Sequence, residues 1–178
     1  MEEKNTTTLA KDKKEFVSSI ITNKEGNVLV LKRREDLKLD PGKYDFCSGH
    51  MKEGEVPMQS MYRELNEELG LKPEQIKLME NLGDIETPHE KLLGTITHLY
   101  HIQIELSSED INNTIKAMKE PEMEKVRYVK DIAFLKRLQT ETESFRGKYT
   151  QQMGLVLDAL EEKINQRKEV EKDLCEEK

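Results

Sequence analysis

Three glutamates, Glu64, Glu67 and Glu68, are spaced so that a helix would carry them on one face. A helix advances about 100° per residue, so the three side chains would project within an arc of ~100°. Carboxylates crowded in this way repel one another by several tenths of a kcal/mol per pair unless a cation lies among them. Mg²⁺ and Mn²⁺ prefer oxygen ligands of this kind. The spacing therefore points to a divalent metal site, to which Glu55 from the preceding loop could add a fourth carboxylate.

The helix that must carry these glutamates is predicted over residues 56–69. Pro57 suits its first position, and Gly70 suits the left-handed residue just after its end. Because glutamate is a strong helix former, an ordinary solvated face is the alternative interpretation of the three carboxylates. The face predicted to pack on the core consists of residues spaced by 4, 3 and 4, namely Met58, Tyr62, Leu65 and Leu69.

The neighbouring residues extend the glutamate pattern over residues 49–71 and decide between these interpretations. Five residues separate Gly49 from Glu55 and seven more precede Arg63, after which the chain reads Arg-Glu-Leu-Asn-Glu-Glu-Leu-Gly-Leu. Every fixed position of the Nudix box is filled, so the chain resembles the Nudix hydrolase superfamily. The resemblance implies an α/β (α+β) Nudix fold, with a mixed β-sheet sandwiched between helices, over residues 14–160.

The resemblance also implies a reaction, the metal-dependent attack of water on a nucleoside diphosphate linked to another moiety. Carried over by position, Glu67 and Glu68 are metal ligands, and Glu64 is a ligand or the general base. Arg63 orients the glutamates by ion pairing, and Glu55 supports the cluster. The glycine at the start of the box lets the loop turn beneath the helix. Which carboxylate takes the proton from the water stays open.

A second resemblance lies upstream of the box. Arg33, Lys38, Pro41-Gly42, an aromatic residue and Gly49-His50 are similar to the isopentenyl-diphosphate isomerase-like branch of the superfamily. In that branch the arginine and the lysine hold a diphosphate, which implies that Arg33 and Lys38 bind substrate phosphates; solvated loop charges are the alternative. The isomerases have a catalytic cysteine directly before Gly-His, where this chain has Ser48, and their box is altered. The chain therefore resembles the hydrolase-type members of the branch.

The positions of several other residues give weaker support for a role in metal binding or catalysis. His50 occupies a position that the branch uses as a metal ligand. His98 shares a predicted strand face with apolar residues, which favours a core histidine. Nudix enzymes often have a further ligand or base in the region of Glu120, Glu122 and Glu124, and of these we favour Glu122 as an additional catalytic residue.

The other elements follow from local patterning. In chain order they are a β-hairpin of Phe16–Thr22 and Asn27–Arg34, a strand at Tyr44–Ser48, a strand at Thr95–Glu105, a helix from Glu109 to Lys119 capped by Ser107 or Ser108, a strand at Lys125–Val129, a helix at Asp131–Leu138 and a last helix through Met153 and Ile164.

Length and composition bound the organisation of the chain. Its 178 residues fit one domain at 14–160, with an N-terminal extension at 1–13 and a charged helix or tail at 161–178. A net charge of −7 disfavours broad nucleic-acid binding, which needs a basic face. The longest apolar run, Val28–Leu31, is far shorter than the ~18 residues that span a bilayer. With neither a secretory signal nor a disulfide framework in evidence, a cytoplasmic protein is expected.

Together these features predict a pyrophosphohydrolase that depends on Mg²⁺ or Mn²⁺ and acts on a small diphosphate-containing nucleotide. An RNA 5′-end or cap pyrophosphohydrolase is the alternative enzyme, which the acidic composition disfavours. A non-catalytic module that senses a nucleotide is the alternative outside enzymes, and the intact box disfavours it. Neither a membrane nor a nucleic acid is an expected partner, and a homodimer stays open.

Overall fold

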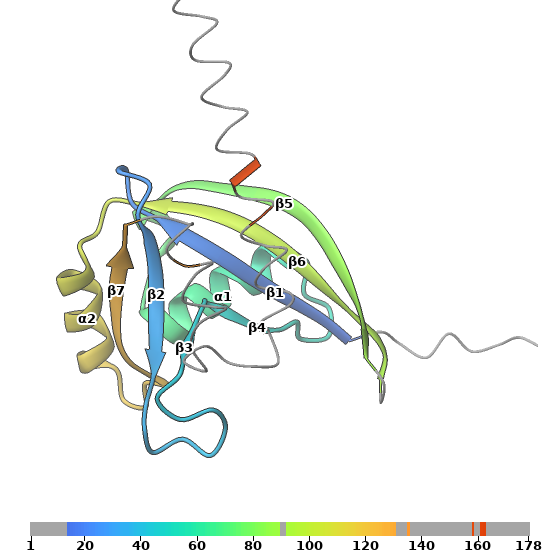
Figure 1. Cartoon of the computed structure of the whole chain (residues 1–178), viewed down its shortest axis with the longest axis horizontal. Coiled ribbons are helices and arrows are strands. Elements are labelled where there is room, and N and C mark those ends of the chain that lie inside the picture. Colours follow the sequence, from blue (N-terminus) through green and yellow to red (C-terminus); the bar gives the residue numbers. More distant parts are fainter. Residues whose placement is uncertain (1–13, 90–91, 131–134, 136–157, 159–160, 163–178) are drawn as a thin grey trace, which may run out of the picture.

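Seven strands form one mixed β-sheet in the computed structural model, which describes residues 14–89, 92–130, 135, 158 and 161–162 (Figure 1). The mixed sheet and its helices confirm the predicted α+β class. In chain order the described elements are β1 (Lys14–Thr22), β2 (Val28–Arg33), β3 (Tyr44–Asp45), β4 (Ser48–His50), α1 (Pro57–Leu69), the 3₁₀ turn η1 (Pro73–Gln75), β5 (Ile76–His89), β6 (Leu92–Ile104), α2 (Ser108–Ala117) and β7 (Met123–Val129).

The strands fall into two groups that meet at β1. The sheet order is β3-β2-β1-β6-β5, with β4 beside β1 and β7 beside β2. β1 pairs with β6 in parallel, and the other pairs are antiparallel. The opposite edge of β1 pairs with β4 at Phe16–Ser18 and with β2 at Thr22. In Figure 1, β2, β3 and β7 run in a different direction from β1, β5 and β6. β4 therefore lies where the two groups diverge.

Apolar side chains cover both faces of this sheet. On one face, α1 and α2 contribute Leu65 and Ile111 to a cluster that also contains Ile102 of β6. A second cluster includes Leu99 of β6 and the buried, helical Leu135. The helices predicted over 131–138 and 153–164 otherwise lie outside the described residues. Within those residues no helix combines the length and the apolar composition needed to cross a bilayer.

Helix α1 begins and ends as predicted. Pro57 is its first residue, and Gly70 follows its last with φ 65°. The backbone N–H of Gly70 donates to the carbonyl of Asn66 at 2.9 Å. A Cβ at Gly70 would lie 2.4 Å from Cγ2 of Thr114 on α2, so the glycine also permits the close approach of the two helices.

The buried face of α1 is turned toward the glutamates compared with the prediction. Met61, Leu65 and Leu69 are fully buried, whereas Met58 is 51% exposed and Tyr62 is half-buried. The prediction for Met58 was wrong because the buried face also includes Glu64 and Glu68. Apolar spacing alone does not reveal this rotation, since it assigns every charged residue to the solvent side.

A strand of 14 residues, β5, was not predicted. It pairs with β6 at the edge of the sheet, with register shifts near Ile76, Asn81 and Thr87. Each irregularity in register moves the following side chains from one face of the strand to the other. The alternation of apolar and polar residues on which strand prediction depends therefore does not persist along β5.

The strand predicted at Tyr44–Ser48 is two short strands. Tyr44–Asp45 pairs with β2, and Ser48–His50 pairs with β1. Phe46 and Cys47 connect them and are both buried. The division follows from the divergence of β1 and β2, because one straight strand cannot pair with both.

The prediction of a core histidine fits His101 better than His98. His101 is buried, and its Nε2 lies 2.9 Å from the hydroxyl of Thr22. His98 has polar partners on both sides, with Nδ1 2.8 Å from Asp84 and Nε2 3.4 Å from Glu15.

Substitution of one residue from each side of α1 would test the orientation of the helix. Leu65→Ala should lower the free energy of unfolding by about 2–5 kcal/mol, because it leaves a cavity in the core. Met58→Ala, at an exposed position of the same helix, should change it by no more than about 0.5 kcal/mol. Urea denaturation of both variants measures the difference, and equal losses would contradict the orientation.

Candidate functional site

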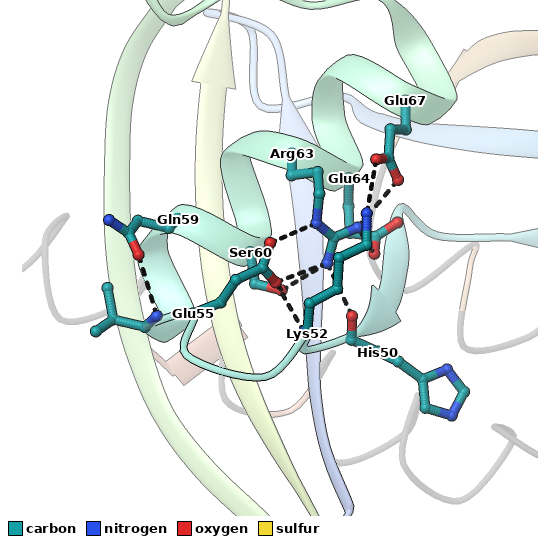
Figure 2. A network of polar contacts seen from close by, with 9 residues as sticks. His50, Lys52, Glu55, Gln59, Ser60, Arg63, Glu64 and Glu67 are labelled. Carbon is teal, nitrogen blue, oxygen red and sulfur yellow. Dashed lines mark hydrogen bonds and ion pairs between the residues drawn. The ribbon is translucent and has the colours of Figure 1, made fainter.

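The guanidinium group of Arg63 joins the carboxylates of the site into one network (Figure 2). Its Nε and Nη2 donate to the two carboxylate oxygens of Glu55 at 2.7 and 2.9 Å. Its Nη1 donates to Glu64 at 2.5 Å and to Glu67 at 3.0 Å. Nη2 also donates to the carbonyl of His50 at 2.8 Å. One arginine thus connects α1 to the loop that precedes it.

Glu55 is held on the far side of Arg63 from the other glutamates. Besides the arginine, its carboxylate accepts hydrogen bonds from the hydroxyl of Ser60 at 2.8 Å and the backbone N–H of Lys52 at 2.9 Å. The Arg63 hydrogen bonds are the main reason why the pKa of Glu55 is lowered from its ordinary value. These contacts suit a residue that positions Arg63.

Glu68 is buried beneath α1. One carboxylate oxygen accepts a hydrogen bond from the backbone N–H of Ser48 at 3.3 Å. Burial raises the pKa of Glu68 well above its ordinary value, and the negative charges of Asp45 and Glu64 add to the effect. A carboxylate in this position gains from a nearby cation, because the cation compensates for the lost hydration.

Glu64 lies directly against β4. A Cβ at Gly49 would come within 2.0 Å of its carboxylate, so only glycine leaves space for the side chain. Burial raises the pKa of Glu64, although the hydrogen bond from Arg63 acts in the opposite direction. The glycine that opens the predicted motif is therefore explained by this close approach.

A cleft of about 710 Å³ opens beside these glutamates. Among its lining side chains are five carboxylates and three cations, so the lining carries an excess of negative charge. Both strand groups and α1 contribute. The lining residues are Phe16, Arg33, Leu39, Ser48, Gly49, His50, Lys52, Arg63, Glu64, Glu67, Glu68, Glu120 and Glu122.

The two predicted phosphate-binding residues are placed differently. Arg33 lines the cleft and is only 7% exposed, with Nε donating to the carbonyl of Leu39 at 3.3 Å. Its Nη1 lies 3.5 Å from the carboxylate of Glu122. Lys38 is exposed in the loop after β2 and is not part of the lining.

Of the three glutamates before and at the start of β7, two line the cleft and one does not. Glu120 and Glu122 line the cleft, whereas Glu124 accepts a hydrogen bond from Lys32 at 3.0 Å. His50 also lines the cleft, but Figure 2 shows its ring turned away from the carboxylates. Of the four predicted carboxylate ligands, Glu55 alone lies outside the lining.

Three lining residues were missed by the sequence analysis: Phe16, Leu39 and Lys52. The position of Lys52 within the motif could have drawn attention to it, since its Nζ lies 3.2 Å from Glu67. No sequence signal distinguishes Phe16 from other strand residues or Leu39 from other loop residues.

The donor chemistry of this cluster fits a hard divalent cation. Glu64, Glu67 and Glu68 offer only oxygen atoms, and two of them are buried carboxylates. In the part of the chain that the structure describes, no three His, Cys, Asp or Glu side chains converge tightly enough to hold an ion. Lys52 and Arg63 instead occupy the carboxylate oxygens of Glu67. A divalent ion would therefore have to exchange with these side chains.

Comparison with known proteins identifies the family of the chain. The NUDIX domain model matches residues 13–153, so the chain belongs to the Nudix family. An RNA pyrophosphohydrolase from Psychromonas ingrahamii is 48% identical over 63 residues, which make up 35% of this chain and 32% of that protein. The match thus spans about a third of the length of this curated relative.

Two solved structures share the fold at low sequence identity. DR0079 from Deinococcus radiodurans has a TM-score of 0.64 at 16% identity, covering 85% of this chain and 88% of that one. The NUDIX domain of Shewanella oneidensis NrtR, solved in complex with ADP ribose, has a TM-score of 0.58 at 15% identity, covering 86% and 90%. These likenesses confirm the predicted Nudix fold.

Gly49→Ala should impair metal binding through Glu64. The added Cβ would meet the Glu64 carboxylate and displace it, so we expect weaker activation by Mg²⁺. In a Glu64→Ala background the carboxylate that the added Cβ would meet is absent. Gly49→Ala should then have no further effect on Mg²⁺ binding. Mg²⁺ titration by calorimetry measures both cases, and additive losses would show that Gly49 acts by another route.

Glu68→Gln should separate two effects of the buried charge: destabilisation of the apoprotein and stabilisation on binding of Mg²⁺. Because the pKa of Glu68 is raised in the folded state, its ionised form destabilises the apoprotein above that pKa. The destabilisation is lost as the pH falls through the raised pKa toward the ordinary value of 4.5. With metal chelated, the variant should therefore be more stable than the wild type near neutral pH and equally stable at about pH 4.

Thermal unfolding with and without Mg²⁺ provides the measurement. An ion that binds only the native state stabilises it, so saturating Mg²⁺ should stabilise the wild type and leave the variant unchanged. A wild type more stable than Glu68→Gln at neutral pH without metal would mean that the carboxylate is a purely structural acceptor.

Proposed function

We propose that the chain hydrolyses a diphosphate linkage in a nucleoside diphosphate joined to another moiety, with Mg²⁺ or Mn²⁺ as cofactor. The observation that carries the proposal is the excess of carboxylates over cations in the cleft lining. A diphosphate would be repelled by such a surface unless added cations neutralised it. Membership of the Nudix family supports the same reaction class.

The residues divide into metal-binding and phosphate-binding sets. Glu64, Glu67 and Glu68 would hold the ion, which supplies charge neutralisation at the phosphoryl oxygens and lowers the pKa of bound water. Arg63 keeps the carboxylates oriented by its hydrogen bonds. Arg33 would contact the substrate phosphates, because it lines the cleft and its ion pair with Glu122 could be replaced by one with a phosphate.

Removal of the water's proton has two carboxylate candidates. Burial raises the pKa of Glu64, which strengthens it as a base. Glu122 directly precedes β7, which pairs with β2. It would lose its ion pair if Arg33 turned to a phosphate. Lys38 would contact the substrate only by movement of its loop, so it is the weaker of the two predicted phosphate contacts.

An RNA 5′ end is the alternative substrate class. The name of the Psychromonas relative, an RNA pyrophosphohydrolase, favours it. A net charge of −7 opposes it, because an RNA chain beyond the 5′ end needs a basic path. A small nucleotide derivative is therefore the preferred substrate, and the complete set of glutamates argues against a module that binds without turnover.

Isopentenyl diphosphate isomerisation is not part of the proposal. The isomerases have a thiol directly before Gly-His, and Ser48 stands there. The neighbouring thiol of Cys47 is fully buried, and burial raises its pKa well above the ordinary value. Such a thiol is poorly suited to exchanging protons with a substrate carbon.

The function is tested by a phosphate-release screen with Mg²⁺ or Mn²⁺ over nucleoside triphosphates, dinucleotides, nucleotide sugars, ADP-ribose and 5′-triphosphate RNA. On the best substrate, Glu67→Gln should lower kcat by at least about 100-fold, the scale for removing one group that stabilises transition-state charge. Glu53→Gln, at an exposed loop position outside the cleft, is the matched control. Wild-type turnover by Glu67→Gln at saturating Mg²⁺ would contradict the assignment of the cluster.

A further inference from the structure

Two rings meet across β1 and β4 at the side of the cleft. Phe16 and His50 are directly paired in the register of these antiparallel strands. Their ring centroids are 4.1 Å apart, with an angle of 44° between the ring planes. Both residues line the same cleft as the glutamates and Arg33. The metal cluster and an aromatic surface are therefore parts of one cavity.

The ring of His50 is free of the carboxylate network. Only its backbone carbonyl accepts from Arg63, while Figure 2 shows its imidazole pointing away from the glutamates. Partial burial and the charge of Lys14 lower the pKa of His50, which favours the uncharged form of the ring. The uncharged imidazole and the phenyl ring of Phe16 together offer aromatic faces for stacking.

An aliphatic side chain adds to the aromatic pair in the same cleft. Leu39, which also lines the cleft, is 48% exposed, and its carbonyl accepts from Nε of Arg33. An apolar side chain is thus kept beside the arginine expected to bind phosphate.

We propose that the Phe16–His50 pair is the subsite for the nucleobase of the substrate. The inference rests on the proposed function and extends it, because it assigns the planar group of the nucleotide to a surface outside the metal cluster. Every base has a π face, so stacking on the pair accepts purines and pyrimidines without reading their hydrogen-bonding edges. Arg33 holds the phosphates, and Leu39 adds an apolar contact.

Two non-hydrolysable probes isolate the base from the phosphates. Methylenediphosphonate and α,β-methylene-ADP share a P–C–P unit and differ by adenosine. Calorimetry with Mg²⁺ should show tighter binding of α,β-methylene-ADP to the wild type. Phe16→Ala should weaken its binding by about 5- to 150-fold, the range for loss of one base–aromatic stack, and leave methylenediphosphonate binding unchanged. Phe16→Leu, which keeps an apolar side chain in the sheet, should show the same selective loss.

The controls separate this subsite from the rest of the cleft. Arg33→Ala should weaken both probes, and Tyr62→Leu, a half-buried aromatic residue outside the cleft, should weaken neither. Should Phe16→Ala fail to fold by circular dichroism, Phe16→Leu and His50→Ala decide the question.

The outcomes distinguish the two proposals. If folded Phe16 and His50 variants bind both probes like the wild type, or lose both equally, the base subsite is wrong while the hydrolase function stands. If the wild type binds neither probe and cleaves no diphosphate substrate, the proposed function fails, and the subsite fails with it.

Discussion

The hydrogen bonds of Arg63 are the constraint on which the site depends. A single guanidinium group contacts carboxylates from the loop and from α1, together with the carbonyl of His50. Its planar set of donors matches several oxygen acceptors at fixed angles, which a lysine could not do. Without this cation, Glu64 and Glu67 would repel each other, and the contacts of Ser60 with Glu55 and of Lys52 with Glu67 would remain between α1 and the preceding loop. The arginine therefore makes a cluster of like charges compatible with a folded apoprotein.

Burial of two carboxylates is the feature of the same cluster that would favour the binding of a metal ion. Glu64 and Glu68 lie on the inner side of α1, where hydration is lost and their pKa values are raised. Backbone and side-chain donors compensate for part of this loss, as the contact from Ser48 to Glu68 illustrates. The remaining cost is what a divalent ion would remove on binding. Stability of the apoprotein and affinity for the ion thus oppose each other at these residues.

Local spacing in the sequence placed the glutamates together on one helix but did not predict how that helix is rotated against the sheet. Spacing along one helix identified Glu64, Glu67 and Glu68, because a local pattern determines which residues share a face. It placed all three opposite the core face, whereas Glu64 and Glu68 are buried and only Glu67 is exposed, since the rotation of α1 depends on contacts with strands distant in the chain. β5 was missed for a related reason, as its register shifts are set by pairing with β6. Phe16 has no local signal at all and reaches the cleft only through the pairing of β1 with β4.

The divergence of the strand groups explains how one cleft can serve both metal and substrate. Residues of α1, β1 and β4 supply the carboxylates and the aromatic pair, and the end of β2 supplies Arg33. Because Arg33 is paired with Glu122 from the segment before β7, the cation expected to bind phosphate is already neutralised in the apoprotein. A phosphate competes with that one carboxylate, whose side chain is 62% exposed and therefore easily rehydrated. A phosphate that took the place of Glu122 would replace one ion pair of the buried Arg33 side chain and would leave the buried glutamates in place.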